Sequence, residues 1–109
     1  MEPSADVVVL TALPVEFRAV SHLLHDQSTL VHPQGTSLVK GKLPGLGGTV
    51  AVARIGAGNL TSAAIAERVR QWLRPQALLF VGVAGGLKPD ARLGDVVVST
   101  KVYHLHPGK

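Results

Sequence analysis

An uninterrupted apolar run that changes abruptly into small residues constrains the fold of this chain most: Leu78-Leu79-Phe80-Val81-Gly82-Val83-Ala84-Gly85-Gly86-Leu87. A run without polar alternation is typical of a strand buried on both faces of a parallel sheet. The glycines that follow bring bare backbone to the carboxyl edge of such a sheet, where a ligand can reach main-chain N–H groups. A simple tight turn after a core strand is the alternative interpretation of the same residues.

The remaining apolar patterns predict strands and helices on either side of this run. Strands are expected over residues 6–11, 27–32, 36–43, 49–55 and 94–100, and helices over 14–25 and 59–74. The strands 36–43 and 49–55 are separated by a turn rich in glycine, which predicts an antiparallel hairpin. The predicted fold class is therefore α/β, with a mixed, mainly parallel central sheet flanked by helices, in a single domain over residues 1–109 that is expected to be incomplete.

Composition excludes several classes of protein. The chain has no apolar run of eighteen residues and no basic leader, so neither a membrane span nor a signal peptide is expected. It has no cysteine, for which a cytoplasmic location is the default. The net charge of +4 reflects only seven carboxylates, and two Phe, one Trp and one Tyr offer little aromatic surface for stacking bases, so no nucleic-acid partner is predicted.

Neither a nucleotide cofactor nor a metal ion is predicted. The segment Gly56-Ala57-Gly58-Asn59-Leu60-Thr61 begins like a dinucleotide fingerprint, but Thr61 replaces the third glycine and no acidic residue follows at the required distance. The segment can still bind an anion or a hydroxyl at a helix N-terminus. The pairs His22/His25 and His104/His106 have no third ligand at a recognisable spacing, and surface histidines explain them better.

Glu16 is the one carboxylate whose predicted position suggests chemistry. It lies in the first turn of the first helix, just past the carboxyl edge of the first strand, and in a parallel sheet this edge coincides with the end of the glycine-rich run. There it can accept a proton from water. The alternative is that Glu16 only complements the helix dipole.

Four stretches in register resemble one family: residues 8–13 with Glu16, Gly56-Ala57-Gly58, Gly82-Val83-Ala84-Gly85-Gly86-Leu87 and Leu93-Gly94-Asp95-Val96-Val97. Their order and spacing are similar to those of the nucleoside phosphorylase/nucleosidase superfamily, and most closely to 5′-methylthioadenosine/S-adenosylhomocysteine nucleosidases. The resemblance extends from about residue 6 to about residue 104.

The resemblance implies a purine nucleoside as substrate and a homodimer as assembly. Glu16 falls where these nucleosidases place the acid that activates the attacking water. Ala84 and Gly85 fall where backbone lines the purine and ribose pocket, and Ala57 falls near the pocket for the 5′ substituent. Val83 occupies a substrate-binding position that is often serine in the nucleosidases, so a hydroxyl that orients the water is lost.

Three functions remain open. Phe80 stands close to where phosphorolytic relatives carry a phosphate-binding arginine, which favours hydrolysis, although Arg54 keeps phosphorolysis possible. The chain covers about the first half of a family domain and lacks the acid that protonates the leaving purine. One carboxylate cannot protonate the base and deprotonate the water together. The chain is therefore expected to be the inactive half of a nucleosidase, with a phosphorylase or a non-catalytic nucleotide-sensing module as alternatives.

Overall fold

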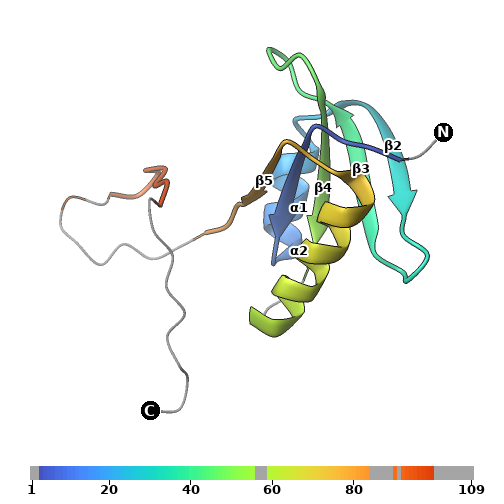
Figure 1. Cartoon of the computed structure of the whole chain (residues 1–109). Helices are drawn as coiled ribbons and strands as arrows, with labels where there is room; N and C mark the ends of the chain where they lie inside the picture. Colours follow the sequence, from blue (N-terminus) through green and yellow to red (C-terminus); the bar gives the residue numbers. More distant parts are fainter. Residues whose placement is uncertain (1–2, 56–58, 84–89, 91, 100–109) are drawn as a thin grey trace.

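The computed structural model describes residues 3–55, 59–83, 90 and 92–99 (Figure 1). Its centre is a five-stranded sheet in the order β2-β3-β4-β1-β5. The strands are β1 (Val7–Thr11), β2 (His25–Val31), β3 (Ser37–Lys42), β4 (Thr49–Arg54) and β5 (Ala77–Phe80). β1 pairs in parallel with β4 and β5, whereas β3 pairs antiparallel with β2 and β4. The predicted mixed sheet and the hairpin of β3 with β4 are confirmed.

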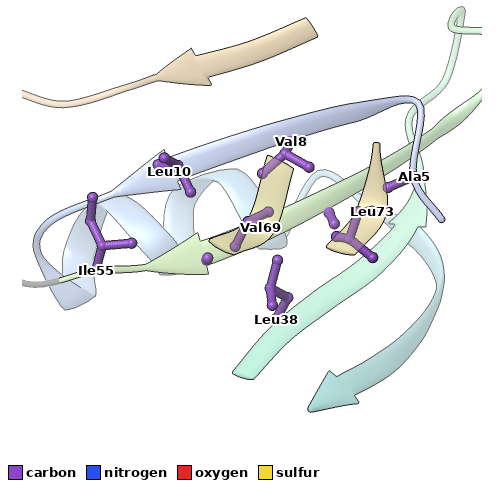
Figure 2. Packing of buried hydrophobic residues seen from close by; sticks show 9 residues of the cluster. Ala5, Val8, Leu10, Leu38, Ile55, Val69 and Leu73 are labelled. Atoms are coloured by element: carbon purple, nitrogen blue, oxygen red, sulfur yellow. The ribbon is translucent and has the colours of Figure 1, made fainter. Parts of the chain in front are cut away.

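Two helices cover opposite faces of this sheet. Alternate residues of a strand point to opposite faces, so β1 contributes to two apolar cores. The core beneath α2 (Asn59–Leu73) includes Val8, Leu10, Leu38, Val69 and Leu73 (Figure 2). The core beneath α1 (Pro14–Ser21) includes Val9, Phe17, Val20, Leu24 and Val52. The predicted α/β class with flanking helices is confirmed, and within the described residues neither helix is long and apolar enough to cross a membrane.

The first helix is shorter than its apolar periodicity predicts. It ends at Ser21 rather than near residue 25, and His25 already belongs to β2. The side-chain amide of Gln27 donates hydrogen bonds to the carbonyl oxygens of Ser21 and Leu24 at 2.7 and 3.1 Å. These bonds satisfy carbonyls that a longer helix would use, and they let the chain turn directly into the strand. Leu24 remains buried, which explains why its helical spacing was misleading.

The prediction that the apolar run is buried on both faces is wrong. β5 is an edge strand of the described sheet, and Leu78, Leu79 and Phe80 are 38%, 49% and 59% exposed. The predicted strand over residues 94–100 is also wrong for its described part. Residues 95–99 form no strand, and Val96, Val97 and Val98 are all exposed. An apolar sequence becomes a buried strand only when a neighbouring element covers it, and no described element covers these two segments.

Candidate functional site

The carboxyl ends of three parallel strands meet at one edge of the sheet. Thr11 at the end of β1 lies opposite Arg54 at the end of β4, and Leu10 lies opposite Phe80 at the end of β5. Ligands of open α/β sheets bind at such an edge, because the loops that leave neighbouring strands diverge there. The backbone bond from the N–H of Val81 to the carbonyl oxygen of Leu10, 3.0 Å long, continues this register beyond β5.

Glu16 connects two of these strand ends. Its Oε1 atom accepts hydrogen bonds from the backbone N–H groups of Ala12 and Leu13, at 3.1 and 2.9 Å. Its Oε2 atom accepts one from the backbone N–H of Val83, at 2.8 Å. The first two donors lie between β1 and α1, whereas the third follows β5 and is 67 residues away in sequence. The carboxylate therefore fixes the end of β5 relative to the start of α1.

The surroundings of Glu16 favour its ionised form. The hydrogen bond from the Val83 N–H lowers the pKa of this carboxyl most, and those from the N–H groups of Leu13 and Ala12 lower it further. Partial desolvation raises the pKa, but by less than the hydrogen bonds lower it. The side chain is only 8% exposed. A carboxylate offers about four lone-pair positions, of which these three bonds occupy three. Among the described residues, no second donor reaches Oε2, which leaves one acceptor position there for a bound hydroxyl or water.

Gly82 permits this close contact between the end of β5 and the carboxylate. A Cβ atom placed on Gly82 would lie 3.2 Å from Glu16 Oε2, closer than ordinary van der Waals contact. The absence of a side chain therefore lets the backbone beyond β5 approach the Glu16 carboxylate, whereas the glycine-rich sequence predicted close approach of a ligand. This close contact explains why the first glycine of the run, Gly82, cannot carry a side chain without displacing Glu16.

The stability that Glu16 contributes is expected to depend on pH. Because its pKa lies below the usual 4.5, the contribution is complete above that value and is lost as the pH falls through the lower pKa of the folded state. Glu16→Gln is neutral at every pH, so the difference in unfolding free energy between wild type and this variant should shrink with acidification. Urea unfolding between neutral pH and pH 3 measures it.

Asp26→Asn is the matched control for this pH measurement. The Asp26 carboxylate is exposed and accepts no hydrogen bond from the described residues, and asparagine tolerates its positive φ of 54°. If the difference from wild type shrank equally for both variants, the proposed origin in the three backbone bonds would be wrong.

The structure brings together two of the five residues that the sequence singles out. Glu16 and Val83 are in direct contact through the Val83 backbone, while the side chain of Val83 is 80% exposed. Ala57, Ala84 and Gly85 lie outside the described residues. Arg54 stands at the same edge of the sheet, exposed and without a hydrogen-bond partner among the described residues.

The start of this site is held more firmly than the sequence predicts. The backbone donors Ala12 and Leu13 were not anticipated, although the three-residue spacing from Leu13 to Glu16 is that of a helix-capping glutamate. Thr11 is fully buried, and its hydroxyl donates a 3.0 Å hydrogen bond to the carbonyl oxygen of Ala53. A lone threonine at the end of an otherwise apolar strand was the available signal for this bond.

A separate hollow of about 560 Å³ lies away from the strand ends, between the β2–β3 turn and α2. The rings of His32 and Trp72 meet edge to face there, 4.9 Å between centroids, and the Arg68 guanidinium donates to the Thr36 hydroxyl at 2.9 Å. These contacts attach the turn to the helix. The hollow shares no residue with the Glu16 site, so it is not part of the candidate site.

The described residues offer no obvious metal site. In that part of the chain no three His, Asp or Glu side chains gather closely enough to hold an ion. His22 follows the end of α1 and His25 begins β2, so the two do not share a helix face. The second histidine pair, His104 and His106, lies outside the described residues.

The fold is that of known nucleosidases. A 5′-methylthioadenosine/S-adenosylhomocysteine nucleosidase from Colwellia psychrerythraea in complex with adenine matches 86% of this chain and 38% of its own, with a TM-score of 0.72 and 21% identity. The enzyme from Neisseria meningitidis in complex with methylthio-immucillin-A matches 82% of this chain and 37% of its own, with a TM-score of 0.69 and 21% identity.

Sequence relatives lead to the same family. The 5′-methylthioadenosine/S-adenosylhomocysteine nucleosidase of Shewanella piezotolerans is 33% identical in an alignment 87 residues long, which covers 78% of this chain and 37% of the relative. ATP nucleosidase Cap17 of Escherichia coli is 33% identical in an alignment 106 residues long, which covers 90% of this chain and 21% of the relative. The chain thus spans well under half the length of these relatives. Residues 6–108 match the Phosphorylase superfamily, and the chain belongs to this superfamily.

Proposed function

We propose that this chain is part of a purine nucleosidase, in which Glu16 accepts a proton from the water that cleaves the N-glycosidic bond. The position of the Glu16 carboxylate carries the proposal: it lies at the carboxyl ends of parallel strands, bound to the N–H of Val83. The residues after Val83 are those that the family resemblance assigns to the purine and ribose pocket. The likeness to methylthioadenosine/adenosylhomocysteine nucleosidases supports this substrate class.

The electrostatics of Glu16 suit this reaction. Loss of a purine leaves positive charge on the sugar, and a nearby anion stabilises such a transition state. Glu16 is ionised at neutral pH, and the backbone hydrogen bonds that lower its pKa hold the negative charge in place while making it a weaker base than a free carboxylate. The free acceptor position on Oε2 can then bind the attacking water and take its proton as the sugar becomes cationic. No metal ion or cofactor is required for this step.

A second group must protonate the leaving purine, and Glu16 cannot do so while it accepts a proton. In our proposal that group comes from the portion of a superfamily domain that this chain does not match, so the isolated chain has little or no activity. A homodimer is a further part of the proposal, drawn from the family resemblance. Sedimentation as a stable monomer would contradict that part.

A chimeric enzyme tests the function. The matched segment of the Shewanella piezotolerans nucleosidase is replaced by the corresponding residues of this chain, and adenine release from methylthioadenosine is measured with and without phosphate. Adenine release that does not require phosphate is expected, with the parent enzyme as reference. A chimera that folds by circular dichroism and releases no adenine would contradict the proposal, and release only with phosphate would indicate a phosphorylase.

ATP is the second candidate substrate. The match to ATP nucleosidase Cap17 covers 90% of this chain, and the exposed guanidinium of Arg54 at the site edge can pair with a phosphate. The same chimera assayed with ATP distinguishes the two. Faster release of adenine from ATP than from methylthioadenosine, lost in Arg54→Gln, would favour the second candidate.

A further inference from the structure

The hollow between the β2–β3 turn and α2 has the size and the lining of a small-molecule site. Its volume of about 560 Å³ lies within the usual range of ligand pockets. The lining combines the rings of His32 and Trp72, the side-chain amides of Gln34 and Gln71 and the guanidinium of Arg68, and it contains no carboxylate. Such a lining suits a ligand that is both planar and anionic.

Arg68 brings an uncompensated positive charge to this hollow. Its Nη1 donates one hydrogen bond, 2.9 Å long, to the buried hydroxyl of Thr36. A guanidinium has five N–H donors, and within the described part of the chain no carboxylate pairs with Arg68 and no second acceptor binds it. The bond to Thr36 fixes the guanidinium beside the hollow. Its remaining donors are therefore positioned in advance for a phosphate.

His32 provides a second donor for an anion. Its Nδ1 accepts a 3.0 Å hydrogen bond from the backbone N–H of Gln34, so the neutral ring carries its hydrogen on Nε2. That N–H has no acceptor among residues 3–55, 59–83, 90 and 92–99. The ring also meets Trp72 edge to face, with 4.9 Å between the centroids. These two contacts hold the imidazole in the wall of the hollow and leave one N–H for a ligand.

Trp72 supplies an aromatic surface beside the cation. It follows Arg68 by four residues on α2, so the indole and the guanidinium lie on the same side of the helix, one turn apart. Trp72 packs against the core beneath α2 but is only partly buried, and with Gln71 it also borders a second hollow of about 370 Å³. An indole of this kind is a favourable surface on which a nucleobase can stack.

We propose that this hollow binds a nucleoside monophosphate, with the base against Trp72 and the phosphate on Arg68. The side-chain amide of Gln34 is exposed and makes no hydrogen bond to the described residues, so it can pair with a polar edge of the base. A nucleotide fits better than an acidic peptide, because ring and cation line one compact hollow rather than an extended surface. The hollow shares no residue with the Glu16 site, so its ligand is independent of the proposed function.

Titration of the full 109-residue chain with AMP, followed by tryptophan fluorescence, tests the proposal. Trp72 is the only tryptophan of the chain, so the signal reports on this hollow. We expect a saturable change with a Kd of about 10 μM to 1 mM, the range for a ligand of this size at an open site. Adenosine and inorganic phosphate should each bind at least about 10-fold more weakly, because each retains only part of the contacts.

Three variants, compared by calorimetry, separate the phosphate contact from the fold. Arg68→Gln should weaken AMP binding by about 10- to 100-fold, because it removes the charged donor. Thr36→Val breaks the same hydrogen bond between turn and helix but keeps the guanidinium, so it should bind AMP far more tightly than Arg68→Gln. Arg54→Gln removes an equal charge at the strand ends and should bind like wild type. Circular dichroism confirms that all three variants fold.

Four outcomes would overturn the proposal. Absence of a saturable change, or equal weakening by Arg68→Gln and Thr36→Val, would mean that Arg68 only attaches the turn to α2. Binding lost in Arg54→Gln would place the nucleotide at the strand ends instead. A fluorescence change that follows the concentration of the chain without AMP would identify a second copy as the occupant. The chimeric nucleosidase tests the Glu16 site separately, so its failure would leave a positive AMP titration standing.

Discussion

Glu16→Gln is expected to lower the rate of glycosidic cleavage in the chimeric nucleosidase by about 10²- to 10⁴-fold, the usual contribution of a general base. The amide cannot accept the proton of the attacking water, and it removes the negative charge that stabilises the cationic sugar. Adenine release from methylthioadenosine, measured as kcat and KM, checks this. The loss should appear mainly in kcat, since the proton is transferred only in the transition state.

Two further variants separate catalysis from damage to the structure. Glu67→Gln alters an exposed carboxylate that pairs with Arg70 at 2.6 Å on α2, away from the strand ends, and should leave kcat unchanged. Glu16→Asp keeps the charge but shortens the side chain, so it should lose less activity than Glu16→Gln. If Glu16→Gln retained full activity, or if Glu67→Gln lost as much, Glu16 would not be the base.

The position of Glu16 was predictable from sequence because it depends on local rules. Pro14 marks the first turn of a helix, and a buried strand immediately before it fixes the edge of the sheet at which Glu16 stands. The parallel pairing of β1 with β5 then brings Val83 to the same edge. Strand and helix periodicity, together with the fact that parallel strands end at one edge, were sufficient to place Glu16 at this edge, whereas the hydrogen bond to Val83 was not predicted.

The burial of residues 78–83 and 95–99 was not predictable in the same way. Hydrophobic periodicity states which residues can be buried, but the covering element determines whether they are. Val96 to Val98 have the composition of a core strand and are nevertheless exposed. For the same reason the end of α1 was misplaced: Leu24 is buried by packing against strands rather than by belonging to the helix.

Leu38→Ala is expected to lower the free energy of unfolding by about 2–5 kcal/mol, the range for removing a fully buried leucine side chain. Leu38 is 0% exposed and lies in β3, in the core beneath α2 (Figure 2). Its neighbours there come from β1, β4 and α2, so a cavity at this point cannot close by moving one element alone. Leu23→Ala is the matched control, because the Leu23 side chain is 59% exposed and should cost much less. Urea unfolding of the full chain measures the free energy of unfolding of both variants. Equal losses for the two variants would mean that the core around Leu38 does not hold β1, β3, β4 and α2 together.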